Sequence, residues 1–309
     1  YSSAASDVYK RQIVSLRIAV TQMCDYTCQY CHREGEFTNP MVEMTQEEIG
    51  RIVTVASGLG VSKVKITGGE PLLRQDTPQI IHQISRTPGI IEVSMTTNAA
   101  HLAEKADELH EAGLKRVNVT VPALNPELYH NITSGNIENA IKGVISAIHA
   151  GISPVKINTI LLRGVNESEV DPLIEFCRET GATLQLIELE PLNVPADYYE
   201  KYYVPLAGVE DKLKDRASKV EVRRYMQNRK IYHLPNVKVE FVRPIENAES
   251  CLNCTRIRLT SDGKLKPCLM RNDNLVDILN PLRNGADDKA LSDLFLEAIK
   301  RREPYYKIK

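Results

Sequence analysis

The sequence predicts an α/β fold in which parallel strands and helices alternate, as in a partial or full (βα) barrel. Two observations lead to this prediction. From Leu16 onward, short β-rich runs alternate with amphipathic helical runs, and a strand-like run recurs about every 25 to 40 residues through six units. The strand-like runs also carry polar residues among apolar ones, which indicates a sheet with one apolar and one polar face.

The βα units are expected to fill residues 13–190 as a partial barrel. Strands are expected at residues 16–21, 63–67, 91–97, 116–121, 155–161 and 184–188. Helices are expected between them at residues 45–58, 76–87, 101–112, 138–150 and 168–180. A capping box from Thr45 to Glu48 opens the first helix, and the last three end at Gly113, Gly151 and Gly181.

The pattern changes after Pro191. Residues 191–250 combine a Tyr-rich loop, a charged helix near 209–218 and short strands such as 237–242. A second group of cysteines and a helix at 287–302 follow, so we expect residues 191–309 to form a C-terminal region that closes the barrel. Residues 1–12 begin without Met and lack periodicity. They could be a non-native or disordered lead, and no element is predicted for them.

Polar side chains occur on these strands where a packed barrel interior would hold Val, Ile and Leu. Alternation lets residues such as Ile18 and Ile66 pack against helices while the polar residues point inward. Burying unpaired Arg or Lys is costly, so a bound anion is expected. For any single residue the alternative is a solvated or Glu-paired position at the rim. The inward-pointing set comprises Arg17, Lys65, Thr96, Asn118, Thr120, Lys156, Asn158 and Glu188.

The overall composition is that of a soluble protein with a sizeable core. The 309 residues are 42% hydrophobic and 26% charged, and 39 basic residues balance 40 acidic ones. We therefore expect neither a nucleic-acid nor a membrane partner. The absence of a long apolar run or a signal peptide favours the cytoplasm. Seven cysteines grouped as three, one and three suggest metal ligands in a reducing compartment rather than disulfides.

The first cysteine group is Cys24, Cys28 and Cys31, three thiols on one stretch of chain. Three thiolates can hold a metal centre and leave one position open for chemistry. Zinc completed by a distant His or Cys is the alternative, although zinc knuckles usually have C-x2-C spacing. The run resembles the C-x3-C-x2-C motif of the radical S-adenosylmethionine (SAM) superfamily, including the aromatic Tyr30. The resemblance implies a [4Fe-4S] cluster whose fourth iron is chelated by SAM.

A second motif, Thr67 to Pro71, lies at the carboxyl end of the second expected strand, where barrel active sites are found. Gly68 and Gly69 allow close backbone approach to a ligand, and Glu70 can accept a hydrogen bond from an ammonium group. In isolation the motif could be an ordinary βα turn. After a C-x3-C-x2-C run, it resembles the radical SAM motif that holds the amino group of SAM.

The second cysteine group is Cys251, Cys254 and Cys268, with a hairpin turn at residues 261–264 between the last two. Arg256 and Arg258 are two residues apart on a strand, so they face the same side and could grip a phosphate chain. Structural zinc with Cys177 or a His as the fourth ligand is the alternative. Cys177 lies in an apolar helical run and is more typical of a buried small residue.

Residues 251–269, C-L-N-C-T-R-I-R-L-T-S-D-G-K-L-K-P-C-L, resemble the second-cluster motif of the GTP 3′,8-cyclase family. These radical SAM enzymes begin molybdenum cofactor biosynthesis, and the resemblance extends from Leu16 to about the end of the chain. It implies a second [4Fe-4S] cluster, on the second cysteine group, that meets guanine. The implied GTP-binding residues are Arg17, Lys65, Thr96, Lys156, Arg256, Ile257 and Arg258. The implied SAM-binding residues are Tyr30, Gly68, Gly69, Glu70 and Thr120. The implied catalytic residues are Cys24, Cys28, Cys31, Arg17, Arg256 and Arg258.

The resemblance also implies a reaction. A 5′-deoxyadenosyl radical from SAM takes H3′ of GTP, and the C3′ radical adds to guanine C8 to give 3′,8-cyclo-7,8-dihydro-GTP. It implies a reducing electron donor and transfer of the product to cyclic pyranopterin monophosphate synthase, and it leaves a homodimer open. The alternatives are another radical SAM enzyme with an auxiliary cluster, such as a peptide-modifying enzyme, or a non-catalytic zinc-binding protein.

The sequence departs from the family pattern at several positions. Asp25 stands where Asn is frequent, Thr120 where Ser is frequent, and Lys65 where many members have Arg, which loses the bidentate fork. Glu190 falls where many have Met beside SAM, and we assign it no role. Many members end in a Gly-Gly tail that reaches the active site, whereas this chain ends in Y-Y-K-I-K. Residues 31–36, C-H-R-E-G-E, resemble archaeal members.

Overall fold

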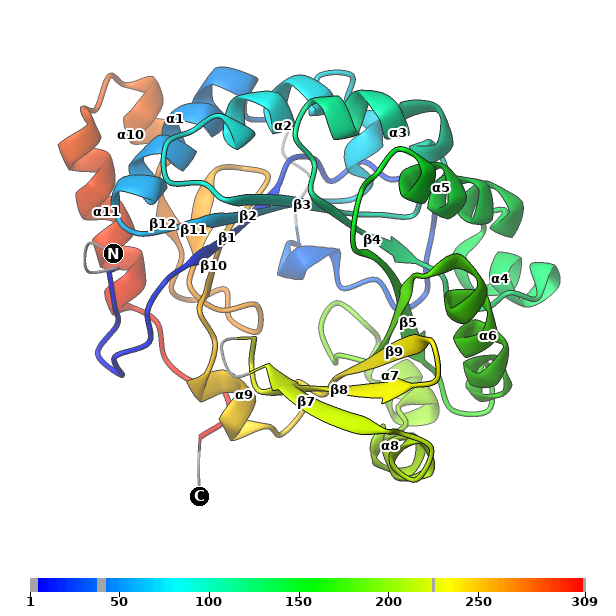
Figure 1. The fold of residues 1–309 in the computed structure, drawn as a ribbon. Coiled ribbons are helices and arrows are strands. Elements are labelled where there is room, and N and C mark those ends of the chain that lie inside the picture. Colours follow the sequence, from blue (N-terminus) through cyan, green and yellow to red (C-terminus); the bar gives the residue numbers. More distant parts are fainter. Residues whose placement is uncertain (1–4, 38–42, 224–225, 308–309) are drawn as a thin grey trace.

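The computed structural model describes residues 5–37, 43–223 and 226–307. Within them, the strands form one 12-stranded sheet in the order β12-β11-β10-β1-β2-β3-β4-β5-β6-β9-β8-β7. The sheet curves into an incomplete barrel with helices on its outer face (Figure 1). This arrangement confirms the expected α/β barrel.

The expected strands and helices of the barrel are all present, with ends within two residues of the expected positions. The strands are β1 (Ser15–Ala19), β2 (Lys63–Thr67), β3 (Glu92–Thr97), β4 (Arg116–Thr120), β5 (Val155–Leu161) and β6 (Thr183–Glu188), all parallel. The helices are α1 (Gln46–Gly58), α2 (Thr77–Ser85), α3 (Leu102–Glu111), α5 (Ile137–His149) and α6 (Val170–Thr180). An additional helix, α4 (Pro126–Thr133), was not expected. It is short, and the Asn125 side chain caps its N-terminus.

The C-terminal region extends the sheet at both of its edges. β9 (Val237–Val242) pairs in parallel with β6 and continues into β8 (Arg229–Leu234) and β7 (Lys219–Arg223). At the other edge, β10 (Arg256–Leu259) pairs in parallel with β1 and continues into β11 (Lys264–Lys266) and β12 (Val276–Asp277). The hairpin expected around residues 261–264 is therefore confirmed. Residues from both ends of the sequence contribute to one barrel wall.

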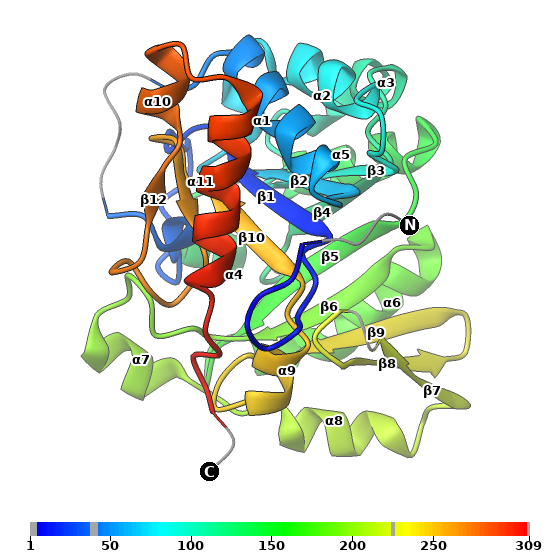
Figure 2. The same ribbon diagram turned by 90° about the vertical axis from the view of Figure 1, so that its left-hand side faces the viewer.

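Helices also cover the C-terminal strands. They are α7 (Ala196–Tyr202), α8 (Ala207–Lys214), α9 (Ala248–Leu252), α10 (Leu279–Arg283) and α11 (Asp288–Lys300). α11 packs against α1, β11 and β12 on the outside of the sheet (Figure 2). The Tyr-rich segment that we expected to be a loop contains α7. Its tyrosines pair at helical spacing, with Tyr198 and Tyr202 rings 4.6 Å apart and Tyr199 and Tyr203 rings 5.0 Å apart.

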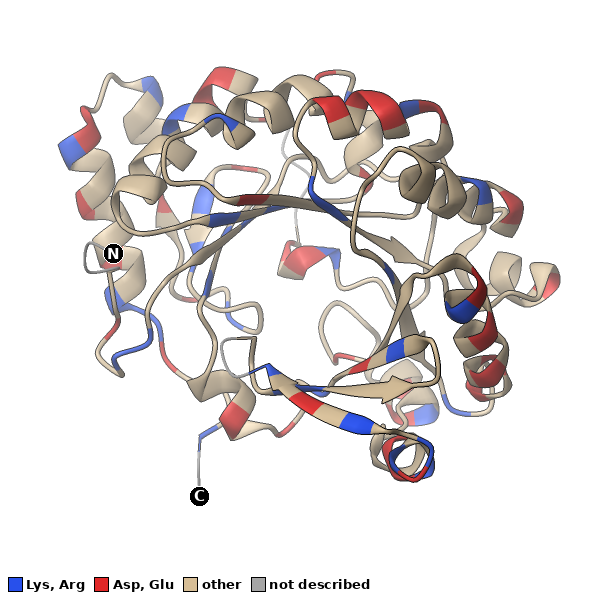
Figure 3. Ribbon diagram, viewed as in Figure 1, with Lys and Arg blue, Asp and Glu red and all other residues tan. Residues whose placement is uncertain are grey.

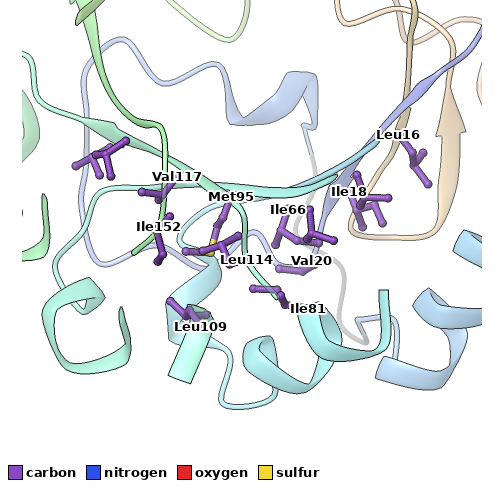
Figure 4. Close-up of a cluster of buried hydrophobic side chains, with 14 of the residues drawn as sticks. Leu16, Ile18, Val20, Ile66, Ile81, Met95, Leu109, Leu114, Val117 and Ile152 are labelled. Carbon is purple, nitrogen blue, oxygen red and sulfur yellow. The ribbon is translucent and has the colours of Figure 1, made fainter. Parts of the chain in front are cut away.

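The hydrophobic core lies between the outer face of the sheet and the helices. Ile18, Ile66, Met95 and Val117 come from neighbouring strands and are buried against helix residues such as Leu109 (Figure 4). These apolar residues alternate along each strand with the polar ones that face the other way. The inner face of the sheet is consequently left for polar side chains.

The described part of the N-terminal segment, residues 5–12, packs into the fold, although its lack of periodicity predicts no element there. Asp7 is buried and forms ion pairs with Arg11 at 2.7 Å and Arg302 at 3.0 Å. Arg11 Nη1 in turn donates to the carbonyl of Cys251 at 2.8 Å. This segment therefore ties the second cysteine group to Arg302, which follows α11. Among the described residues, no helix is long and apolar enough to cross a bilayer.

Candidate active site

The barrel interior contains a cavity of about 340 Å³, which strands and loops from both halves of the chain line. Figure 3 shows Lys and Arg positions along the strands that surround this interior. The predicted inward direction of the polar side chains is confirmed, because every member of that set lines the cavity: Arg17, Lys65, Thr96, Asn118, Thr120, Lys156, Asn158 and Glu188. Arg256 and Arg258 line it as well. Ile257 lies between them and points into the hydrophobic core, so only its backbone could meet a ligand.

The first cysteine group and the Thr67–Pro71 motif lie together at the cavity. Cys24, Cys28 and Cys31 line it with Tyr30, Gly68, Gly69 and Glu70, and all three thiols are free of disulfides. The amide of Gly69 donates to the Thr21 carbonyl at 2.8 Å, and the amide of Glu70 donates to the Met23 carbonyl at 2.7 Å. The motif is therefore bonded to the backbone that leads into the cysteine loop.

The two glycines of this motif are required by close packing of backbone against backbone. A Cβ at Gly68 would lie 2.2 Å from the Thr21 carbonyl oxygen, and one at Gly69 would lie 2.1 Å from the Met23 carbonyl oxygen. From the motif alone, these glycines are expected to allow close approach of a ligand. The structure gives a different reason, which is that the motif must approach the cysteine loop.

Glu70 is buried and joins the loops that follow β2 and β3. Its carboxylate accepts hydrogen bonds from the amide of Leu72 at 3.0 Å, the hydroxyl of Thr97 at 2.8 Å and the amide of Asn98 at 2.7 Å. Burial nevertheless raises the pKa of Glu70 to about 7. Oε2 accepts only one of these bonds, so it retains a lone pair for the ammonium group that we expected it to bind.

The second cysteine group faces the same cavity. Cys251, Cys254 and Cys268 all line it, and none forms a disulfide. Burial raises the pKa of the Cys254 thiol, but the nearby guanidinium groups of Arg302, Arg256 and Arg258 outweigh burial and lower that pKa to about 7. The amide of Tyr306 donates to the Cys251 sulfur at 3.5 Å, and Tyr305 and Tyr306 line the cavity. The C-terminal segment thus reaches the site.

Each set of three thiols suits an iron–sulfur cluster with one iron left open, because three thiolates on one cavity wall are what such a cluster requires. Burial raises the pKa of Cys24 to about 11 and that of Cys28 to about 12, so these thiols need a metal to hold them as thiolates. Cys177 is buried in α6 and does not line the cavity, so it does not complete a zinc site. Across the described residues, no three or more His, Cys, Asp or Glu side chains converge closely enough to hold a single metal ion such as zinc, whereas the ligands of a four-iron cluster lie farther apart.

Two buried carboxylates pair with five of the basic side chains that line the cavity. Glu34 accepts from Arg17 at 3.0 Å and from the Thr67 hydroxyl at 2.9 Å, and its other oxygen lies 3.8 Å from Arg258 Nε. Burial opposes ionisation of Glu34, but Arg17, His32 and Arg258 outweigh it and lower the pKa of this carboxyl.

Glu240 plays the same part on the opposite portion of the sheet, on β9. It is fully buried, contacts Lys156, and lies 3.3 Å from Arg223 Nη1 and 3.8 Å from Arg229 Nη1. Burial would raise the pKa of Glu240, but these three cations lower it to about 2. Glu240 is therefore ionised in the folded protein at neutral pH.

Lys65 and Arg256 have no carboxylate partner among the described residues. Lys65 Nζ donates to the side-chain oxygen of Asn118 at 2.7 Å. Burial lowers the pKa of both groups, and neighbouring cations, Arg17 foremost, lower it further. Two cations that are held close to other cations in this way leave an uncompensated positive charge, which an anionic ligand would offset.

Further basic residues line the cavity that were not predicted from the sequence, among them Arg116, Arg223 and Arg229. Arg116 lies two residues before Asn118 on β4, so alternation along the strand could have found it. Arg223 and Arg229 flank the turn between β7 and β8, in the region where the βα pattern ends. No sequence signal placed that hairpin at the barrel.

Comparison with known proteins agrees with this geometry. Residues 18–177 match the radical SAM superfamily, and residues 182–308 match the family described as Molybdenum Cofactor Synthesis C. A protein of Methanocaldococcus jannaschii named "Probable GTP 3′,8-cyclase" is 48% identical over 98% of this chain and 99% of its own length. A protein of Thermococcus kodakarensis with the same name is 44% identical over 97% of this chain and 99% of its own length.

Solved structures share the fold at much lower identity. SuiB of Streptococcus suis, in its crystal structure with SAM, has a TM-score of 0.67 at 15% identity over 96% of this chain and 76% of that chain. The fold is therefore that of the radical SAM enzymes. From the matched family regions and the near full-length relatives, we conclude that the chain belongs to the radical SAM superfamily and, within it, to the family of the GTP 3′,8-cyclases.

Proposed function

We propose that the protein is a GTP 3′,8-cyclase that converts GTP to 3′,8-cyclo-7,8-dihydro-GTP, the first step of molybdenum cofactor biosynthesis. The main support for this proposal is that Lys65 and Arg256 have no carboxylate partner among the described residues and lie in a cavity that both cysteine groups line. A triphosphate supplies the missing negative charge, and the cysteines supply ligands for redox cofactors. Membership of the radical SAM superfamily supports SAM and an iron–sulfur cluster as cofactors.

We further propose two [4Fe-4S] clusters. Cys24, Cys28 and Cys31 would hold the cluster that binds SAM, and Cys251, Cys254 and Cys268 would hold the cluster that meets guanine. When bound and reduced by an external donor, the first cluster would supply the electron that cleaves SAM, and SAM would supply the 5′-deoxyadenosyl radical that removes H3′ of GTP so that C3′ can bond to guanine C8. The protein contributes binding, orientation and exclusion of water.

The roles of the chain's own residues follow from their positions. Lys65 and Arg256 would bind phosphate oxygens directly, because no carboxylate among the described residues competes for them. Arg17 and Arg258 retain buried Nε groups without a hydrogen-bond partner in the described part of the chain, and these donors are available to the same anion. Thr96, Thr120 and Asn158 are uncharged and would hydrogen-bond to the sugar or to SAM.

Lys156 differs from the other proposed GTP ligands, because Glu240 already pairs with it. Burial lowers the pKa of Lys156 to about 8, although Glu240 opposes this change. We expect Lys156 to contribute a hydrogen bond and shape rather than a full unpaired charge. A peptide-modifying enzyme remains the second candidate, but a peptide would not require the uncompensated cations.

The direct test is anaerobic incubation of the cluster-loaded protein with SAM, dithionite and GTP, followed by mass analysis. Formation of 5′-deoxyadenosine together with the cyclised nucleotide supports the proposal. Cleavage of SAM without any modified nucleotide would reject it. A separate electron donor, delivery of the product to cyclic pyranopterin monophosphate synthase, a homodimer and a cytoplasmic location remain predictions.

A further inference from the structure

The segment that follows the first cysteine group connects it physically to the strands proposed to bind phosphate. This segment, residues 33–36, begins two residues after Cys31, and its first three residues form the 3₁₀ turn η1 (Arg33–Gly35). Glu34 projects from it to Arg17 on β1 and Arg258 on β10. Those two strands are adjacent, and Arg17 and Arg258 are directly opposite each other in the sheet. One carboxylate thus links the cysteine loop to two proposed phosphate ligands.

The backbone of the segment is held in an unusual conformation. Arg33, Glu34 and Gly35 all have positive φ, at 49°, 52° and 74°. For residues with a Cβ this conformation is costly and persists only when the surroundings impose it. A Cβ at Gly35 would lie 2.7 Å from the Leu269 carbonyl oxygen, so glycine is required at that position. The segment is therefore built to fit closely against the hairpin of the second cysteine group.

Hydrogen bonds fix the segment at both ends. Asn193 Nδ2 donates to the carbonyls of His32 and Glu36, each at 2.9 Å. The carboxylate of Glu36 accepts from the Ser261 amide at 3.1 Å and from its hydroxyl at 2.5 Å. Lys266, which is fully buried, donates to the Gly35 carbonyl at 3.2 Å. A segment clamped in this way transmits a displacement of Glu34 to its neighbours instead of absorbing it by bending.

We infer that Glu34 is a positioning residue that couples occupancy of the GTP site to the affinity of the first cysteine loop for SAM. The inference rests on the proposed function. A triphosphate that binds Arg17 and Arg258 shares these guanidinium groups with Glu34, which accepts from Arg17 Nη1 and lies 3.8 Å from Arg258 Nε. Glu34 then changes its partners, and the clamped turn passes the change to Cys31. Two sites that bias one element in this way have coupled affinities.

Charge alone also couples the two ligands, and a matched control separates that effect. SAM is a sulfonium cation, so the triphosphate offsets the cations of the cavity and favours SAM whatever Glu34 does. Glu240 carries one negative charge, as Glu34 does. It lies on β9, and its partners are Lys156, Arg223 and Arg229. Glu240→Gln therefore changes the charge of the cavity as Glu34→Gln does, without touching the cysteine loop.

The test measures the dissociation constant of SAM by anaerobic calorimetry on cluster-loaded protein, with and without saturating GTP and without a reductant, so that no turnover occurs. In the wild type we expect GTP to tighten SAM binding at least about fivefold, at the low end of usual couplings. In Glu34→Gln, GTP should tighten SAM binding by less than about twofold, whereas in Glu240→Gln the wild-type effect of GTP on SAM binding should remain. By reciprocity, SAM should tighten GTP binding by the same factor in each protein.

Three results would overturn the inference. GTP could leave the dissociation constant of SAM unchanged in the wild type, Glu34→Gln could keep the full effect of GTP on SAM binding, or both variants could lose that effect equally. If Glu34→Gln does not fold or load its clusters, Glu34→Asp replaces it. That variant keeps the charge and withdraws the carboxylate by one methylene, so it should also lose the coupling. Absence of any GTP binding to the wild type would instead reject the proposed function, and the cluster spectra show whether each variant retains its iron.

Discussion

Replacing Arg256 by alanine should weaken GTP binding without lowering the stability of the ligand-free protein. Arg256 is half-buried and lacks a carboxylate partner in the described part of the chain. Burial, then Arg17, Arg258 and Arg229, lower its pKa, so removing the charge relieves repulsion. A charge-assisted hydrogen bond contributes about 1.5 to 3 kcal/mol. Since about 1.4 kcal/mol is tenfold in affinity, loss of one bond to phosphate predicts roughly 10- to 150-fold weaker binding.

Arg258→Ala is the matched comparison, because it removes the same charge from the next inward position on β10. Arg258 lies 3.8 Å from Glu34, so its loss should weaken GTP binding and also lower the melting temperature. Anaerobic calorimetry with GTP and thermal unfolding of the ligand-free protein measure the two effects. Guanosine lacks phosphates and should bind the wild type and Arg256→Ala equally. Equal loss of GTP and guanosine affinity in Arg256→Ala, or equal destabilisation by both substitutions, would refute the reasoning.

Four further predictions concern the cysteines, the glycine motif and the buried carboxylate of β9. Cys28→Ala should abolish SAM cleavage, and 5′-deoxyadenosine at the wild-type rate under dithionite would contradict the assignment. Cys254→Ala should retain about half of the iron and lose cyclisation, which metal analysis and product analysis can check; zinc at this site in the wild type would exclude a second cluster. Gly69→Ala places a Cβ 2.1 Å from the Met23 carbonyl oxygen, so it should destabilise the protein by about 1–3 kcal/mol and weaken SAM binding, and unchanged calorimetric affinity would count against it. Glu240 has its pKa lowered to about 2 in the folded protein. Its ionisation therefore stabilises the protein above the unfolded pKa of about 4.3, and this contribution is lost as the pH falls toward 2. The difference in free energy of unfolding between wild type and Glu240→Gln should shrink over that range, and a constant difference would show that the ion pairs contribute nothing.

The barrel and the direction of its inward-pointing residues were predictable because alternation along a strand is a local property. Arg17, Lys65 and Lys156 were identified from their positions among apolar neighbours, and all line the cavity. Their counter-ions were not identified. Glu34 lies in a turn and Glu240 on a strand far along the chain, and which acid meets which base depends on how the sheet closes. Long-range charge pairing of this kind leaves no periodic signal.

The C-terminal region was predicted less completely for the same reason. Its cysteine hairpin was identified by residue type and turn chemistry, whereas its attachment to both edges of the sheet depends on strand pairing over long sequence separations. Arg223 and Arg229 enter the cavity only because β9 pairs with β6. The helix α7 was mistaken for a loop because its run of tyrosines lacks an apolar stripe, and ring pairing at helical spacing supports it instead.

The most direct test of the proposed function is the fate of the 3′ hydrogen of GTP. The cluster-loaded protein is incubated anaerobically with SAM, dithionite and GTP that carries deuterium at C3′, and the products are analysed by mass. The proposed function predicts one deuterium in 5′-deoxyadenosine and its absence from C3′ of the cyclised nucleotide. Unlabelled 5′-deoxyadenosine, or a modified nucleotide that keeps the deuterium at C3′, would contradict it.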